Sequence, residues 1–178
     1  VLQLNLSAID VDEDDLTFFA ESSDSVNVPV EINGKVLTAT PVPNFNGTVN
    51  ITVTVEDGNG GSDSKTFQLT INAINDPPVI ANPGNRFTDE DTPLTITLFA
   101  TDVDGDNLTY FASSDNGNVE VSISGNQLTM TPALNWFGTA NITIGVNDGT
   151  VDSNEETFQL TVNSVNDPPV ITSSPITT

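Results

Sequence analysis

The 178-residue sequence contains no cysteine and no histidine. Without cysteine the chain forms no disulfide, and without both residue types it lacks the usual ligands of a zinc site. The Ser-His-Asp and Cys-His arrangements of acyl-transfer enzymes are excluded for the same reason. Paired carboxylates can hydrolyse glycosides, but here they lie in repeated turn positions, with no large insertion to form a cleft. We therefore expect a protein that is not an enzyme.

Basic residues are also scarce, because three lysines and arginines stand against 25 acidic residues, for a net charge of −22. This charge argues strongly against nucleic acid or an anionic membrane surface as a partner. No apolar run approaches the length that spans a bilayer, so we expect no direct membrane insertion of this segment. The dense negative charge predicts instead that the folded protein binds cations, since bound divalent ions relieve the repulsion between its acidic side chains.

The chain contains two copies of one unit. When residues 44–80 are placed over residues 135–171, more than half of the positions are identical, including all of "NDPPVI". Upstream, after a one-residue shift, "DVDEDDLTFFA" aligns with "DVDGDNLTYFA". Within each copy the apolar residues alternate with polar ones in short runs, which is typical of half-buried strands. "NGK" suggests a tight hairpin in the first copy, after an alternating run that begins at Val26.

About seven short strands per copy, separated by turn residues, indicate an all-β protein of two tandem Greek-key β-sandwiches of the immunoglobulin-like kind. We expect repeat 1 at residues 1–76, repeat 2 at residues 77–167, and a linker with the start of a further repeat at residues 168–178. The second copy carries an extra leading segment, "ANPGNRFTDEDT", which would supply a first edge strand. The first copy lacks this segment, so we expect the chain to be a piece of a longer array.

Acidic residues recur at three places in both copies. An Asp-x-Asp follows an early strand, an Asp-Gly follows the "NIT" strand, and an Asn-Asp precedes the double proline. Carboxylate and amide oxygens in this number, without nitrogen or sulfur ligands, suit Ca²⁺. Any one of these motifs alone is ordinary turn chemistry; their joint recurrence favours a metal site. The candidate ligands are Asp10, Asp12, Asp57, Asn75, Asp76, Asp102, Asp104, Asp148, Asn166 and Asp167.

In a sandwich, the loops that carry these motifs and the incoming connector can lie at one end of a domain. Asn75 and Asp76 are then expected to meet Asp102, Asp104 and Asp148 at the junction between consecutive repeats. The double proline makes the connector stiff, because each proline fixes φ and removes a backbone donor. A rival interpretation is an EF-hand-like loop at residues 10–21, with Asp10, Asp12, Asp14 and Glu21 at its ligand positions. Its sixth position is Asp15 rather than glycine, and an alternating strand pattern follows, so we reject it.

Across essentially the whole chain, these motifs resemble the cadherin-like tandem repeats of large bacterial cell-surface and adhesin proteins. The resemblance implies calcium at each junction and adds Glu90, in "TDEDT", as the early glutamate that serves the exit junction with Asn166 and Asp167. It assigns Asp10, Asp12 and Asp57 to a junction with a preceding domain. Two positions of the family's linker differ, because Asn72 replaces an aspartate and Pro77 an asparagine. The family's Asp-Arg-Glu segment is also missing, so we expect fewer ions or weaker binding.

The function that we expect is a calcium-rigidified extracellular repeat, an adhesion or extender module of a larger surface protein, with neighbouring repeats of the same polypeptide as its first partners. One alternative is a polysaccharide- or protein-binding module, including homophilic association. Trp136 aligns with Phe45, which favours a packing role for both aromatic residues over a sugar platform. The other alternative is a metal-free acidic immunoglobulin-like spacer.

Overall fold

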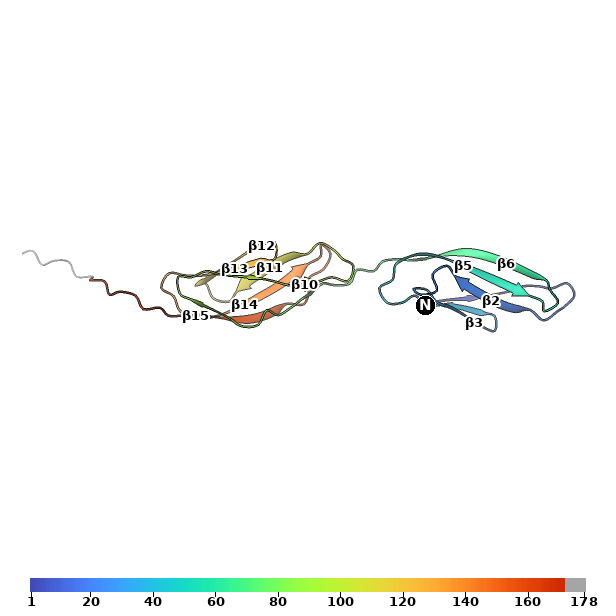
Figure 1. Ribbon diagram of the computed structural model, residues 1–178, viewed down its shortest axis with the longest axis horizontal. Helices are drawn as coiled ribbons and strands as arrows, with labels where there is room; N and C mark the ends of the chain where they lie inside the picture. The colour runs from blue at the N-terminus through green and yellow to red at the C-terminus, as the bar shows by residue number, and fades with distance from the viewer. Residues whose placement is uncertain (172–178) are drawn as a thin grey trace, which may run out of the picture. The chain divides into compact units, whose positions relative to one another are not determined.

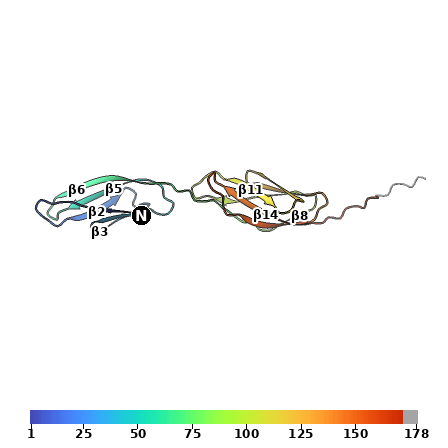
Figure 2. The same ribbon diagram turned by 180° about the vertical axis from the view of Figure 1, so that it is seen from behind.

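Most of the alternating runs form strands in the part of the chain that the structure, a computed structural model, describes. This part is residues 1–171, and it contains strands and no helix. The chain divides into unit 1, Val1–Ile74, and unit 2, Asn75–Thr178. Figures 1 and 2 show the strands of each unit from opposite sides. Most of the predicted start of a further repeat, residues 172–178, lies outside the described residues. Among the described residues, no helix could cross a membrane.

Unit 1 consists of two antiparallel sheets of three strands each. One sheet has the order β1-β4-β3, formed by Leu2–Asn5, Val36–Ala39 and Val30–Asn33. The other has the order β2-β5-β6, formed by Thr17–Ser22, Gly47–Glu56 and Ser62–Ile71. Val28, Leu37 and Ile51 are fully buried between the sheets, each contributing about 1.5–3 kcal/mol to the free energy of unfolding.

The region before β3 differs from the prediction. The alternation predicted a strand from Val26, but β3 begins only at Val30 and Val26 is 80% exposed. Asp24 is the reason, because its carboxylate accepts hydrogen bonds from the backbone N–H and side-chain amide of Asn27, at 3.0 and 2.7 Å. These bonds stabilise a turn where the apolar pattern alone indicates a strand. The predicted β3–β4 hairpin is present, with Gly34 at φ 61° as its first turn residue.

Unit 2 repeats this arrangement and adds strands. One sheet has the order β12-β13-β9, formed by Val119–Ser124, Gln127–Pro132 and Leu94–Thr97. The facing sheet has the order β11-β14-β15-β8, formed by Thr109–Ser114, Gly138–Asn147, Glu156–Asn163 and Arg86–Asp89. Its edge strand β8 pairs parallel with β15, which confirms that the extra leading segment supplies an edge strand. A short antiparallel pair joins β7, Val79–Ile80, to β10, Ala100–Thr101.

The core of unit 2 is larger than that of unit 1. Leu128, Met130, Ile142, Ile144 and Leu160 are completely buried. Trp136 packs partly buried against this core, and a Cβ added at Gly138 would lie 3.1 Å from its ring. Its counterpart Phe45 likewise packs against the core of unit 1. Both aromatic side chains therefore stabilise the folded unit.

Candidate metal centre

The loop that follows β10 folds around the side chain of Asp102. Its Oδ1 accepts the backbone N–H groups of Asp104 and Asp106, at 2.9 and 3.1 Å. Gly105 adopts φ 78°, a left-handed conformation that glycine accommodates without strain. This local bonding turns the chain back on itself. One carboxylate oxygen from each of Asp102, Asp104 and Asp106 lies within 4.8 Å of the other two.

Asp102 is partly buried, whereas Asp104 and Asp106 are exposed. The Oδ2 of Asp102 is inaccessible to solvent, and among the described residues it has no hydrogen-bond partner. An unpartnered buried carboxylate oxygen is costly, because water no longer solvates its charge. Two further carboxylates within the same few ångströms add repulsion. A cation bound at Oδ2 would offset both costs, so the donor set fits a hard divalent ion such as Ca²⁺.

The connector bonds directly to this end of unit 2. The backbone N–H of Asp76 donates to Oδ2 of Asp104 at 2.7 Å. The side-chain amide of Asn75 donates to Oδ2 of Asp148 at 2.8 Å. Both residues precede Pro77 and Pro78, whose rings restrict the backbone. Asn75 and Asp76 are thus held against the loops that carry the recurrent aspartates.

Asp148 occupies the loop after β14 and is only 8% exposed. Its Oδ1 accepts the backbone N–H groups of Thr150 and Val151, at 2.6 and 2.7 Å. The Asn75 amide, followed by the N–H of Val151, lowers the pKa of Asp148 below its ordinary value. Hydrogen bonds to the charged form have this effect because they favour the carboxylate over the acid. Asp148 is therefore a negative group that its surroundings keep ionised.

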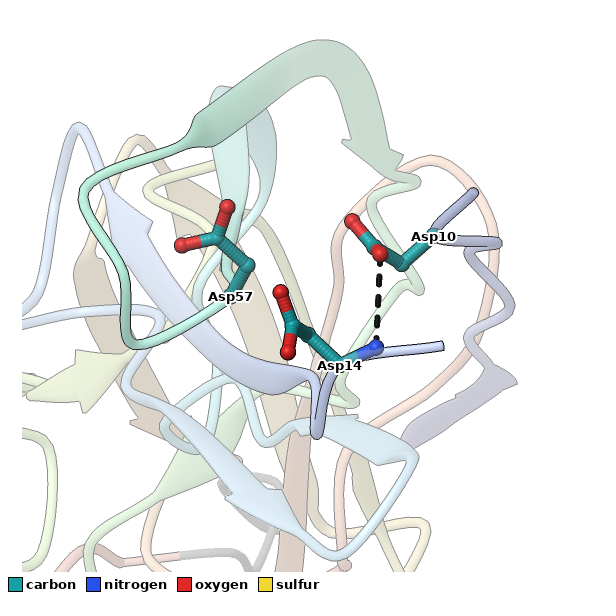
Figure 3. A group of neighbouring side chains, drawn as sticks. All are labelled: Asp10, Asp14 and Asp57. Carbon is teal, nitrogen blue, oxygen red and sulfur yellow. Dashed lines mark hydrogen bonds between the residues drawn. The ribbon is translucent and has the colours of Figure 1, made fainter. Parts of the chain in front are cut away.

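Unit 1 has a similar cluster, which Figure 3 shows in close view. One carboxylate oxygen from each of Asp10, Asp14 and Asp57 lies within 4.8 Å of the others. Oδ1 of Asp10 accepts the backbone N–H groups of Asp12 and Asp14, at 2.8 and 3.3 Å. The N–H groups of Asn59 and then Gly61 lower the pKa of Asp57. The Asp10 loop thus follows the same bonding pattern as the Asp102 loop.

Two members of these clusters, Asp14 and Asp106, are absent from the ligand set inferred from the sequence. The sequence signal that identifies them is the third aspartate of an alternating Asp-x-Asp-x-Asp. Among the sequence interpretations, only the rejected EF-hand loop used Asp14 as a ligand. The structure instead gathers Asp14 with Asp10 and Asp57, whereas Asp12 is exposed and lies outside this group. The loop is followed by strand β2, which begins at Thr17, and not by the helix that follows an EF-hand loop.

Glu90 lies near the outgoing connector of unit 2. It follows β8, is 6% exposed, and its carboxylate accepts the backbone N–H of Val165. Its own N–H donates to the carbonyl oxygen of Asn163 at 2.9 Å. Asn166 and Asp167 follow directly and are exposed, and the Asn166 amide bonds only the carbonyl of Asp167, at 3.4 Å, among the described residues. Glu90 thus holds the backbone that leads to these two residues.

The sequence pattern of a protein family, described as "Bacterial Ig domain", matches residues 1–70 and again residues 75–161. The chain belongs to this family. The two matched stretches follow the internal repeat, one bacterial Ig domain for each copy. Immunoglobulin-like and cadherin-like domains of this type are usually non-enzymatic and typically extracellular. A search of curated proteins found no match.

Cadherin ectodomains share the fold of this bacterial Ig pair. Protocadherin Gamma B2 extracellular domains 1–5 match with a TM-score of 0.58 and 16% identity, over 84% of this chain and 34% of that one. Human Protocadherin-24 EC1-2 matches with a TM-score of 0.58 and 14% identity, over 91% and 88% of the respective chains. The expected resemblance to cadherin-like repeats and the expected all-β sandwich fold are confirmed.

An endo-fucoidan hydrolase from glycoside hydrolase family 107 also matches, at 22% identity and a TM-score of 0.43, over 92% of this chain. This bacterial Ig pair spans only 26% of that enzyme's length and 34% of the Protocadherin Gamma B2 chain.

Proposed function

We propose that this pair of bacterial Ig domains is a calcium-binding, calcium-rigidified repeat that acts as an adhesion or extender module of a larger protein at the cell surface. The observation that carries the proposal is the buried, unpartnered Oδ2 of Asp102 within the described part of the chain. It lies in a cluster of three carboxylates to which the connector is already bonded. The cadherin-like fold of both units supports the same proposal.

The residues that would hold an ion at unit 2 come from the two loops and the connector. Asp102, Asp104 and Asp106 supply the clustered carboxylates. Asp76 and Asp148 lie outside this group; the N–H of Asp76 bonds to Asp104, and Asp148 bonds to Asn75. Calcium takes six to eight oxygen ligands in a flexible arrangement, which suits such a set. Asn75 now directs its amide nitrogen at Asp148, so it must turn the amide over to offer its oxygen.

Unit 1 and the exit of unit 2 hold the remaining candidates. Asp10, Asp14 and Asp57 would form the corresponding site with a connector that enters unit 1. Asp12 would join it only if its exposed carboxylate turned inward. At the exit of unit 2, Glu90 would act with Asn166 and Asp167, for which its bond to Val165 is the supporting contact.

Stiffening follows from the bonds that the ion would add. Without it, two hydrogen bonds tie Asn75 and Asp76 to the loops of unit 2. A shared ion would hold the same two residues more firmly and would cancel the repulsion among the aspartates. Extracellular calcium modules bind at ~10⁻⁴–10⁻³ M. At a hundredfold excess over the dissociation constant, binding stabilises the folded state by about 2.7 kcal/mol.

The proposal is tested by thermal unfolding of the 178-residue chain in EDTA, in millimolar calcium, and in matched magnesium and sodium chloride. A calcium-specific rise in Tm that the double change Asp102→Asn/Asp104→Asn abolishes would support it. The control Glu120→Gln/Glu155→Gln removes the same charge at exposed positions and should keep the rise. An equal Tm in every solution would leave the metal-free acidic spacer as the function.

Nothing in the described surface favours the polysaccharide-binding alternative at the tryptophan. Trp136 packs against the core and covers Gly138, so its ring already has a structural role. A sugar platform needs an exposed aromatic face.

A further inference from the structure

Two strands of unit 2 run side by side in the same direction. Strand β8, Arg86–Asp89, lies near the start of the unit, and strand β15, Glu156–Asn163, lies near its end. Four residue pairs join the two strands in parallel register. The other strand pairs that the structure describes in unit 2 are antiparallel. The parallel pair therefore connects the first part of the unit directly to its last strand.

Side-chain hydrogen bonds extend this pairing to residues that precede β8. The amide of Asn82 donates to Oε2 of Glu156 at 2.8 Å and to the carbonyl oxygen of Thr157 at 3.2 Å. The side-chain oxygen of Asn85 accepts the backbone N–H of Gln159 at 3.0 Å. Asn82 and Glu156 are 74 residues apart, as are Asn85 and Gln159 and the paired residues of the two strands. The segment that leads into β8 is therefore bonded to β15 in the register of the strands.

Further bonds extend the pairing at the other end of β8. The amide of Asn163 donates to Oδ1 of Asp89 at 3.1 Å. The backbone N–H of Glu90 donates to the carbonyl oxygen of Asn163 at 2.9 Å, and the Glu90 carboxylate accepts the N–H of Val165. Residues 82–90 are thus bonded to residues 156–165 both before and after the four paired residues.

The direction of the two strands decides how a pulling force acts on these bonds. The chain enters β8 at Arg86 and leaves β15 at Asn163, and in a parallel pair these two points lie at opposite ends of the strands. Tension along the chain therefore pulls the strands past each other lengthwise. The hydrogen bonds of a parallel pair are evenly spaced along the strands, so they carry this load together. Separation then requires several bonds to break at once.

The sheet pairing that precedes residues 82–90 is shorter. Strand β7 pairs with β10 over two residues. Before it, Asn75 donates one hydrogen bond to Asp148, and the backbone N–H of Asp76 donates one to Asp104. We therefore expect a load on the chain to detach this entering segment first and then to reach the β8–β15 pair.

We propose that unit 2 has a mechanical function, in which residues 82–90 and 156–165 form a clamp that bears tension along the chain. The clamp goes beyond the proposed calcium function and needs no ion, because its bonds join protein atoms. Only its use, to keep an extender module folded while an attached cell is pulled, rests on the proposed function. All measurements are made in EDTA, so a chain that binds no calcium tests the clamp equally well.

The test is the lifetime of folded unit 2 under constant force in optical tweezers, with handles attached to two introduced cysteines. The 178-residue chain has no cysteine of its own, so each pair defines the points of attachment. Ala81→Cys/Ser164→Cys pulls the two segments past each other. Thr92→Cys/Ser164→Cys pulls at neighbouring ends of the same segments, so their bonds break one after another. All three positions are exposed.

Forced unfolding is governed by the unfolding rate, so the two lifetimes compare the barriers in the two directions. The lifetime should be at least about tenfold longer when the segments are pulled past each other, since each hydrogen bond that must break together slows rupture by about two- to tenfold. Equal lifetimes in the two geometries would overturn the proposal. This comparison leaves residues 82–90 and 156–163 unchanged apart from the attachment sites beside them, so it stands even where a variant of the clamp does not fold.

A variant that shortens the clamp supplies the second measurement. Asn82→Ala/Asn163→Ala removes the side-chain bonds to Glu156, Thr157 and Asp89, so the lifetime under lengthwise pulling should fall by about fourfold or more. Thr129→Ala is the control, because it removes an exposed 2.8 Å side-chain bond to Thr95 in the facing sheet and should leave this lifetime unchanged. A lifetime that the double variant leaves unchanged, or that Thr129→Ala shortens as much, would overturn the proposal.

Discussion

The side-chain amide of Asn75 donates a 2.8 Å hydrogen bond to the carboxylate of Asp148, and these residues are far apart in the sequence. Asn75 comes from the connector, and Asp148 follows the long strand β14. The bond fastens the connector to the loop whose carboxylate is kept ionised. Because Asn75 is a neutral hydrogen-bond donor, the Asp148 carboxylate has a bonding partner at this end of unit 2 without a metal ion.

We expect Asn75→Asp to lower Tm in EDTA and to increase the rise in Tm on adding calcium. The new carboxylate would face that of Asp148 at hydrogen-bond distance, so the two charges repel until a cation bridges them. Asn46→Asp adds the same charge at an exposed position outside both carboxylate clusters and serves as the control. An unchanged calcium response in Asn75→Asp would contradict a metal site that includes this position.

The two aspartates that follow Asp10 should differ in their effects. Asp14 lies within 4.8 Å of Asp10 and Asp57, measured between carboxylate oxygens, whereas Asp12 lies outside this group. Isothermal titration calorimetry should therefore show a larger loss of calcium affinity in Asp14→Asn than in Asp12→Asn. The reverse order would show that the family's Asp-x-Asp pattern describes the ligands better than this geometry does.

The turn before β3 should make stability depend on pH. The side chain of Asn27, and then its backbone N–H, lower the pKa of Asp24 below its ordinary value. The stabilisation is present above the unfolded pKa of about 3.9 and is lost as the pH falls through the folded value. In Asn27→Ala the pKa of Asp24 should rise, which carbon-detected NMR titration of the carboxyl group measures. A pKa that stays the same would assign the shift to the backbone bonds alone.

The contact between the Phe111 ring and Gly145 predicts how a small substitution in the β11–β14 pair affects stability. Phe111 and Gly145 are paired across β11 and β14, and the Phe111 ring occupies the place that a Cβ at Gly145 would need. Gly145→Ala should lower the free energy of unfolding by about 1–3 kcal/mol, the usual cost of overpacking. Gly117→Ala, which meets nothing within 4 Å, should have little effect in the same denaturant titration.

The alternation of apolar and polar residues was sufficient to predict most strands. In a run such as Leu94–Thr97, this alternation depends only on which face of the strand is buried. It failed before β3, where Asp24 bonds to Asn27 locally and replaces strand with turn. Apolar pattern carries no information about such side-chain bonds. The β7–β10 pair was also missed, since two-residue strands show no period.

For the candidate site, recurrence identified the right loops but not every member. Asp106 was missed because an Asp-x-Asp pair is sufficient for the family pattern, whereas the loop's turn around Asp102 brings the third aspartate inward. The buried state of Asp102 Oδ2 depends on packing around the loop, which no spacing in the sequence specifies.

Glu90 should control the order of the outgoing connector. Its carboxylate, 6% exposed, accepts the N–H of Val165, one residue before Asn166. Glu90→Ala removes this acceptor and leaves the N–H without its partner, so we expect a loss of about 1–3 kcal/mol in the free energy of unfolding. Hydrogen exchange should show faster exchange at the Val165 amide. Glu90→Gln keeps an acceptor oxygen and should restore most of the protection in EDTA, while any calcium-dependent protection of residues 165–167 should be lost with the charge. Equal calcium protection in Glu90→Gln and the unchanged chain would restrict Glu90 to a structural role.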